Sequence, residues 1–99
     1  MLCYMDDSEE QRRLEEHLLA IRLYLKHHFP DYIITEASVP NLHHTFTVMN
    51  IERGMRHRLK VDWKRLSDAS NTPENTRSAL DSSEVASGMR QVGNTDYYW

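Results

Sequence analysis

Residues 51–67 carry the densest positive charge of the chain and are its first candidates for chemistry. The segment holds six basic residues against two acids, a net charge of +4, whereas the whole chain has a formal net charge of -3. The basic residues are Arg53, Arg56, Arg58, Lys60, Lys64 and Arg65. Clustered cations of this kind bind nucleic-acid phosphates or acidic protein surfaces. Because the chain as a whole is acidic, a general affinity for polyanions is not expected.

The basic residues follow an alternation that predicts a β-strand with one charged face. Over residues 55–62, apolar and charged side chains alternate. If the apolar side chains face the core, the opposite face carries Arg56, Arg58 and Lys60 about 6.6 Å apart, close to the spacing of phosphates along a nucleic-acid strand. Charged residues on the solvent face of an edge strand are also ordinary, because they discourage pairing with other chains. The pattern therefore leaves both interpretations open.

Other residue types give no chemical site. Zinc needs several converging ligands, and the adjacent histidines His27-His28 and His43-His44 point in different directions on a helix or strand. Cys3 lies in an N-terminal segment with no rigid scaffold to hold a nucleophile. The three glycines lie too far apart for a phosphate-binding loop. We therefore predict no catalytic residue, no metal and no cofactor, and a protein that is not an enzyme.

A long helix and a three-stranded antiparallel meander are expected to position the basic segment. Ser8 and Gln11 have the spacing of a capping box, and apolar residues recur at helical spacing as far as Pro30, which predicts a helix over about Ser8–His28. Alternating patterns predict strands over residues 31–38, 43–50 and 55–62. Gly54 suits the loop between the last two strands, because such loops need a positive φ.

The C-terminal third predicts one or two short helices and an aromatic end. Proline after Thr72 marks one helix start, and Asp81 with Glu84 marks a second that stops near Gly93. The fold class is therefore α+β, in the order α-β-β-β-α. We predict a flexible segment over residues 1–7, a single compact domain over 8–92, and a tail over 93–99 that is an edge strand or disordered.

The tail ends in Tyr97, Tyr98 and Trp99, three aromatic residues in a row. Tyrosine and tryptophan are enriched at protein interfaces, because each combines a large apolar ring with a polar group. They also close thin cores. The tail is therefore predicted either to anchor a partner or to pack on its own domain.

The element order resembles that of the double-stranded-RNA-binding domain. That family has a lysine-rich segment at the start of its last helix, whereas the segment SDASNTPENTRSAL is acidic, with Arg77 as its one base. The loop VPNLHH between the first two strands also lacks the family's glycine-proline pattern. The resemblance is therefore confined to element order, and the sequence assigns no family.

Composition favours a small intracellular protein that binds other macromolecules. One cysteine allows no internal disulfide, and the sequence shows neither a signal peptide nor a membrane-spanning stretch, so we expect a cytoplasmic protein. The predicted function is a non-enzymatic protein-interaction module, such as a regulator, adaptor or inhibitor, with a charge-segregated surface and a basic hairpin. The alternative is nucleic-acid binding through residues 51–65. A homodimer through an exposed sheet edge is a further expectation.

Overall fold

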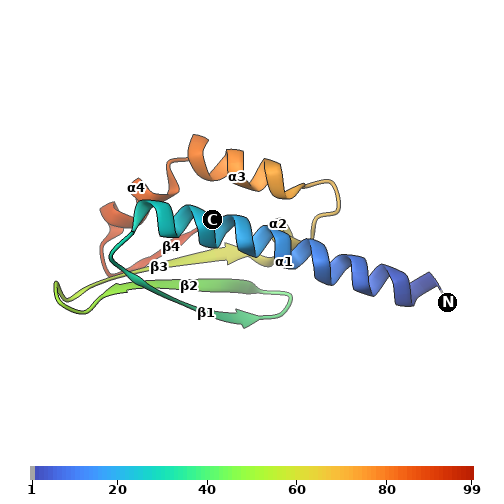
Figure 1. Cartoon of the computed structure of the whole chain (residues 1–99), viewed down its shortest axis with the longest axis horizontal. Helices are drawn as coiled ribbons and strands as arrows, with labels where there is room; N and C mark the ends of the chain where they lie inside the picture. The colour runs from blue at the N-terminus through green and yellow to red at the C-terminus, as the bar shows by residue number, and fades with distance from the viewer. Residues whose placement is uncertain (1) are drawn as a thin grey trace.

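A four-stranded sheet with all of its helices on one side forms the molecule (Figure 1). The computed structural model describes the backbone of residues 2–99 and the side chains of residues 9–99. The elements are α1 (Leu2–His28), β1 (Ile33–Val39), β2 (His43–Asn50), β3 (Met55–Asp62), α2 (Trp63–Ser67), α3 (Pro73–Ser82), α4 (Val85–Val92) and β4 (Asp96–Tyr98). The predicted α+β class, with a long first helix, a meander and short C-terminal helices, is confirmed.

Helix α1 is longer than the sequence pattern indicated. It begins at Leu2, so the predicted start at Ser8 is wrong. Residues 2–7 contain neither proline nor glycine, and nothing in that stretch prevents the helix from continuing back past Ser8. The capping box predicted for Ser8 lies outside the described side chains. The predicted end is confirmed: α1 stops at His28, just before Pro30.

The sheet has the strand order β1-β2-β3-β4. Strands β1, β2 and β3 form the predicted antiparallel meander, and Gly54 in the second loop has the expected positive φ of 65°. Strand β4 then adds to β3 in parallel, with Asp96 beside Arg58 and Tyr98 beside Lys60. The C-terminal residues 96–98 are therefore an edge strand of the same sheet.

Strand β3 ends at Asp62, as the sequence pattern predicted. Trp63 then begins the short helix α2. Asp62 adopts an extended conformation, and its side chain accepts a hydrogen bond from the backbone N–H of Lys64 at 3.1 Å. Asp62 is therefore an N-cap, which turns the chain away from the sheet.

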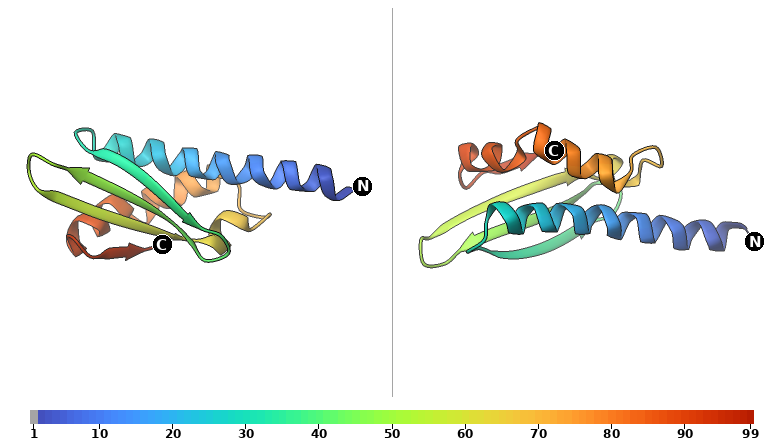
Figure 2. Two further views of the ribbon diagram at one scale, coloured as in Figure 1. Left: turned by 90° about the horizontal axis from the view of Figure 1, so that it is seen from below. Right: turned by 45° about the horizontal axis from the view of Figure 1, so that its top comes forward.

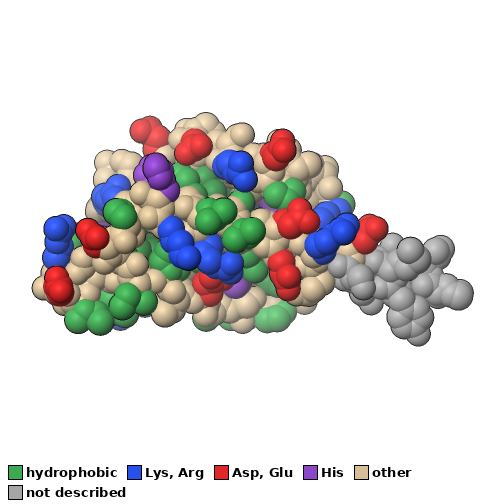
Figure 3. Space-filling view, viewed as in Figure 1, with side chains coloured by type: hydrophobic (Ala, Val, Ile, Leu, Met, Phe, Trp, Pro, Cys, Tyr) green, Lys and Arg blue, Asp and Glu red, His purple; other side chains and the backbone are tan. Residues whose placement is uncertain are grey.

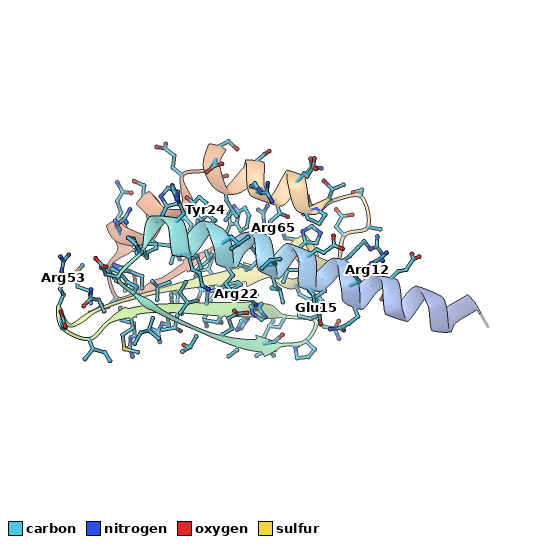
Figure 4. All side chains as sticks on the ribbon, in the orientation of Figure 1. Arg12, Glu15, Arg22, Tyr24, Arg53 and Arg65 are labelled. Carbon is cyan, nitrogen blue, oxygen red and sulfur yellow. The ribbon has the colours of Figure 1, made fainter. Side chains whose placement is uncertain are left out.

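The core lies between the helices and the covered face of the sheet. It includes Ile21 and Leu25 of α1, Phe29 just after that helix, Phe46 and Val48 of β2, Leu59 and Val61 of β3, and Leu80, Val85 and Met89 of α3 and α4. Tyr24 (Figure 4) joins α1 to α4, because its hydroxyl accepts a hydrogen bond from the backbone N–H of Ala86 at 3.0 Å. The side chain of Glu84, the N-cap residue of α4, makes no capping hydrogen bond, so the Tyr24 hydroxyl satisfies a free N–H at the start of that helix.

A buried histidine fixes α3 against α1. His17 is 1% exposed, and its Nε2 donates a hydrogen bond to the carbonyl oxygen of Asn71 at 3.0 Å. Its Nδ1 lies 2.7 Å from the hydroxyl of Thr76 and accepts from it when the ring is neutral. Burial lowers the pKa of His17, so this neutral form persists in the folded protein.

Gly88 gives strand β4 its place against α4. A Cβ atom on Gly88 would lie 2.5 Å from the ring of Tyr97. Alanine normally favours a helix over glycine by about 1 kcal/mol. Because the added methyl group would overlap the Tyr97 ring and displace it from its packing on α4, we expect Gly88→Ala to lower the free energy of unfolding by about 1–3 kcal/mol instead. Urea denaturation followed by tryptophan fluorescence measures the change.

The matched control is Ser87→Ala, at an exposed position of the same helix. It should change stability by less than about 0.5 kcal/mol. A Gly88→Ala protein as stable as the wild type would show that Tyr97 does not pack on α4 in this way.

Candidate interaction surface

The helices leave one face of the sheet uncovered, as the view from below shows (Figure 2). In β2 the residues alternate between buried and half-buried, and the half-buried set points away from the helices. Residues paired with this set in the neighbouring strands share its face. We call this the open face; it consists of Ile33, Thr35, Ala37 and Val39 of β1, His43, Thr45, Thr47 and Met49 of β2, Arg56, Arg58, Lys60 and Asp62 of β3, and Asp96 and Tyr98 of β4.

The open face has an apolar side and a charged side. Its β1 edge carries Ile33 and Val39, which are 55% and 45% exposed, with Thr35 and Ala37 between them. Threonines occupy the middle of β2. Charged side chains follow on β3 and β4. The surface therefore changes from apolar to ionic across the width of the sheet.

Two of the six predicted basic residues share one carboxylate on this face. The Nε atom of Arg58 lies 2.7 Å from Oδ1 of Asp96, and Nζ of Lys60 lies 3.4 Å from Oδ2 of the same carboxylate. Partial burial raises the pKa of Asp96, but its contacts with Lys60 and Arg58 outweigh that effect and hold it below its ordinary value. Asp96 therefore stays ionised and offsets much of the positive charge on β3.

Arg65 is also committed to a partner within the chain. Its guanidinium lies 3.8 Å from the ring centroid of Trp99, and its Nε donates a hydrogen bond to the Trp99 carbonyl at 3.2 Å. The backbone N–H of Trp99 donates in turn to the carbonyl of Lys60 at 2.8 Å. The cation–π contact between Arg65 and Trp99 therefore helps to hold the C-terminal strand against β3.

The remaining three basic residues are exposed but lie apart. Arg53 is at the tip of the β2–β3 loop (Figure 4), and Arg56 is at the start of β3. Lys64 lies past the other end of that strand, in α2. None of the three forms an ion pair with a residue whose side chain is described. At about 3.3 Å per residue, the strand separates Arg56 from Lys64 by more than about 20 Å.

The three aromatic residues of the tail have different environments. Tyr97 points into the fold and packs on the core beside Gly88. Trp99 packs on Arg65. Tyr98 is 72% exposed on the open face, with Nζ of Lys60 5.9 Å from its ring centroid. Of the predicted aromatic anchors, Tyr98 alone has the exposure that contact with another molecule requires.

Acidic and basic side chains also alternate over the side of the molecule that faces the viewer in Figure 3. Lysine and arginine lie among aspartate and glutamate there, with hydrophobic side chains between them. The charge separation seen along the sequence is therefore not repeated as separate surface regions on this side.

A charged cluster under the β1 edge ties α1 to the sheet. Arg22 of α1 binds Glu36 of β1 through two contacts, one of them from Nη2 to Oε1 at 2.9 Å, and His44 Nε2 donates to the same Oε1 at 3.1 Å (Figure 4). Partial burial raises the pKa of Glu36, but the hydrogen bonds from Arg22 and His44 outweigh burial and lower the pKa overall. Glu36 was not a predicted site residue, because its partners are distant in sequence.

The described residues also form a hollow beside α1. This hollow of about 360 Å³ between α1 and α2 is lined in part by Leu14, Trp63 and His17, and both ring nitrogens of that histidine are already bonded. Within the described part of the chain, no three His, Cys, Asp or Glu side chains are grouped to hold a metal ion. No described helix has the length and apolar character to cross a membrane.

Comparisons of the chain with known protein families, with curated proteins and with solved structures found no match.

The Glu36 cluster predicts an acid-sensitive contribution to stability. Because the folded pKa of Glu36 is below its ordinary value of about 4.3, this contribution is complete above that pH and is lost as the pH falls through the folded pKa. We expect Glu36→Gln to cost about 1–2 kcal/mol at pH 7. The difference from the wild type should shrink towards pH 3 in urea denaturation curves.

The exposed Glu52 of the β2–β3 loop gives the matched control, and Glu52→Gln should have little effect at either pH. A Glu36→Gln cost that stays the same from pH 7 to pH 3 would contradict an ionised Glu36 in the folded state.

Proposed function

We propose that this protein is a small non-enzymatic protein-interaction module, acting as a regulator, adaptor or inhibitor, whose open face binds a protein partner. The observation that carries the proposal is the uncovered sheet face, which displays apolar β1 residues beside charged β3 and β4. Ile33 and Val39 are both exposed on the open face of β1, and a partner that covered them would gain from removing their apolar surface from water.

The chemistry of the face suits a protein partner. An interface core is apolar with one or two aromatic anchors, and its rim is polar. The β1 residues supply the apolar core and Tyr98 the aromatic anchor. Arg53 and Arg56, at the hairpin end, supply positive charge at the rim. Rim charges steer association more than they add affinity, which favours a partner with acidic residues facing the hairpin. The single cysteine fits work in the reducing cytoplasm.

Nucleic-acid binding through residues 51–65 is the competing function. The contacts of Arg58 and Lys60 with Asp96, and of Arg65 with Trp99, weigh against it, because they leave no continuous row of free cations along β3. A phosphate track needs several such cations in line.

Fluorescence anisotropy with labelled duplex DNA, single-stranded DNA and duplex RNA separates these functions. We expect no saturable binding at about 150 mM salt, and only weak binding at low salt, because three scattered cations release few counterions. The variant Arg53→Glu with Arg56→Glu removes the hairpin charge. The variant Arg12→Glu with Arg77→Glu makes the same net change at exposed sites on α1 and α3. Tight, salt-dependent binding lost in the hairpin variant alone would establish the nucleic-acid function instead.

Site-specific photocrosslinking in the native host tests the protein partner. A benzoylphenylalanine in place of Tyr98 keeps an aromatic ring on the open face. We expect it to give an adduct of defined mass, whereas the same residue at the exposed Ser87 of α4 should give none. Adding Thr45→Lys with Thr47→Lys in the middle of the face should reduce the yield about tenfold or more. Equal labelling from Tyr98 and Ser87 would show that the open face binds no specific protein.

A further inference from the structure

Strand β1 is the long free edge of the sheet. The other edge, β4, has three residues, whereas β1 has seven, and all of them except Ile34 are exposed. Natural sheets usually protect such an edge with lysine, proline or a bulge. Strand β1 contains no lysine, arginine or proline, and it pairs with β2 in an unbroken register from Ile33 to Val39.

Glu36, the one charged residue of β1, does not protect the edge from pairing with another strand. Glu36 lies on the helix side of the sheet, where Arg22 and His44 bind its carboxylate. On the open face the strand presents Ile33, Ala37 and Val39 with one threonine. The edge therefore combines free backbone hydrogen-bonding groups with apolar side chains, which is the combination that favours strand addition.

We propose that β1 pairs antiparallel with β1 of a second copy of this chain, in a register centred on Glu36, to make one continuous eight-stranded sheet. The strand is self-complementary about that centre. Ile33 then faces Val39 of the second copy, and Thr35 faces its Ala37, so small and branched side chains meet on the open face. A twofold axis repeats each contact, as the interface of two identical chains requires.

This register places the Glu36 residues of the two copies opposite each other at the twofold axis. Two like charges directly opposite each other in a sheet are destabilising. Here each Glu36 carries its own Arg22, within hydrogen-bonding distance on the helix side, so the two carboxylates meet as neutralised pairs. The glutamate that would otherwise oppose pairing is thus compensated within each copy.

Pairing would also give the open face the layout of an interface. Eight strands at about 4.8 Å span roughly 38 Å. The apolar β1 residues of both copies lie at the centre, and the charged β3 and β4 strands lie at the two sides, as in an apolar core with a polar rim. The pairing itself does not depend on the proposed protein partner.

Sedimentation equilibrium of three full-length proteins tests the pairing. Wild type should approach twice the chain mass of 11.7 kDa as its concentration rises. Thr35→Lys with Ala37→Lys places lysines at the proposed contact and should weaken the dimer at least about 100-fold. The control variant, Thr47→Lys with Thr45→Lys, places two lysines on β2 at the residues that pair with Thr35 and Ala37. Its dimer dissociation constant should stay within about threefold of the wild-type value.

Two outcomes overturn the proposal. One is a wild type that stays monomeric at about 100 μM. The other is a dimer lost equally in both lysine variants while both keep cooperative thermal unfolding, which would move the contact to the open face. Loss of the Tyr98 crosslink to a foreign protein with the dimer intact would instead remove only the proposed partner function, and the reverse result would remove only the dimer.

Cysteine crosslinking keeps the test decisive if a lysine variant fails to fold. In a Cys3→Ser background, Thr35→Cys with Ala37→Cys should form a disulfide-linked dimer on mild oxidation, because opposed residues of an antiparallel pair lie within disulfide reach. Thr47→Cys with Thr45→Cys should not. Absence of the crosslink from the β1 pair would rule out this register.

Discussion

The arrangement of the protein depends on one constraint, the burial of a single face of the sheet under α1. Side chains of a strand alternate between its two faces, so burying Phe46, Val48, Leu59 and Val61 forces their neighbours to the other side. The helices supply enough apolar surface to cover one face and no more. Everything that makes the protein a candidate for binding, from Ile33 to Tyr98, is what that alternation leaves uncovered on the second face.

The C-terminal strand connects stability with surface charge. Tyr97 packs on Gly88 and Trp99 packs on Arg65, so both rings hold β4 on the sheet. Docking β4 in parallel brings Asp96 beside Arg58 and Lys60. The same strand that completes the core therefore offsets part of the positive charge of Arg58 and Lys60 on the open face. Changes that loosen β4 should expose Arg58 and Lys60 together, and surface charge is thus coupled to packing 30 residues away along the chain.

Much of the fold was predictable from local signals. Pro30 marks the end of α1, Gly54 marks the hairpin loop, and Thr72 caps α3 by accepting a hydrogen bond from Asn75. The features that were not predictable are contacts between residues far apart in sequence. Three residues carry too little pattern to reveal β4 or its parallel pairing with β3. The same holds for the candidate site. The basic residues were predictable from the sequence, but their contacts with Asp96 and Trp99 were not.

The folded protein divides the basic segment that dominates the sequence. The net charge of a segment is a sum over its residues. A binding partner interacts with the charges that are not already paired within the protein. Arg58, Lys60 and Arg65 are each held by the C-terminal strand, which leaves Arg53 and Arg56 at one end of β3 and Lys64 at the other. Cations divided in this way suit the rim of an interface better than a phosphate track. The apolar β1 edge, which the charge pattern of the sequence does not mark, is the centre of the interface proposed above.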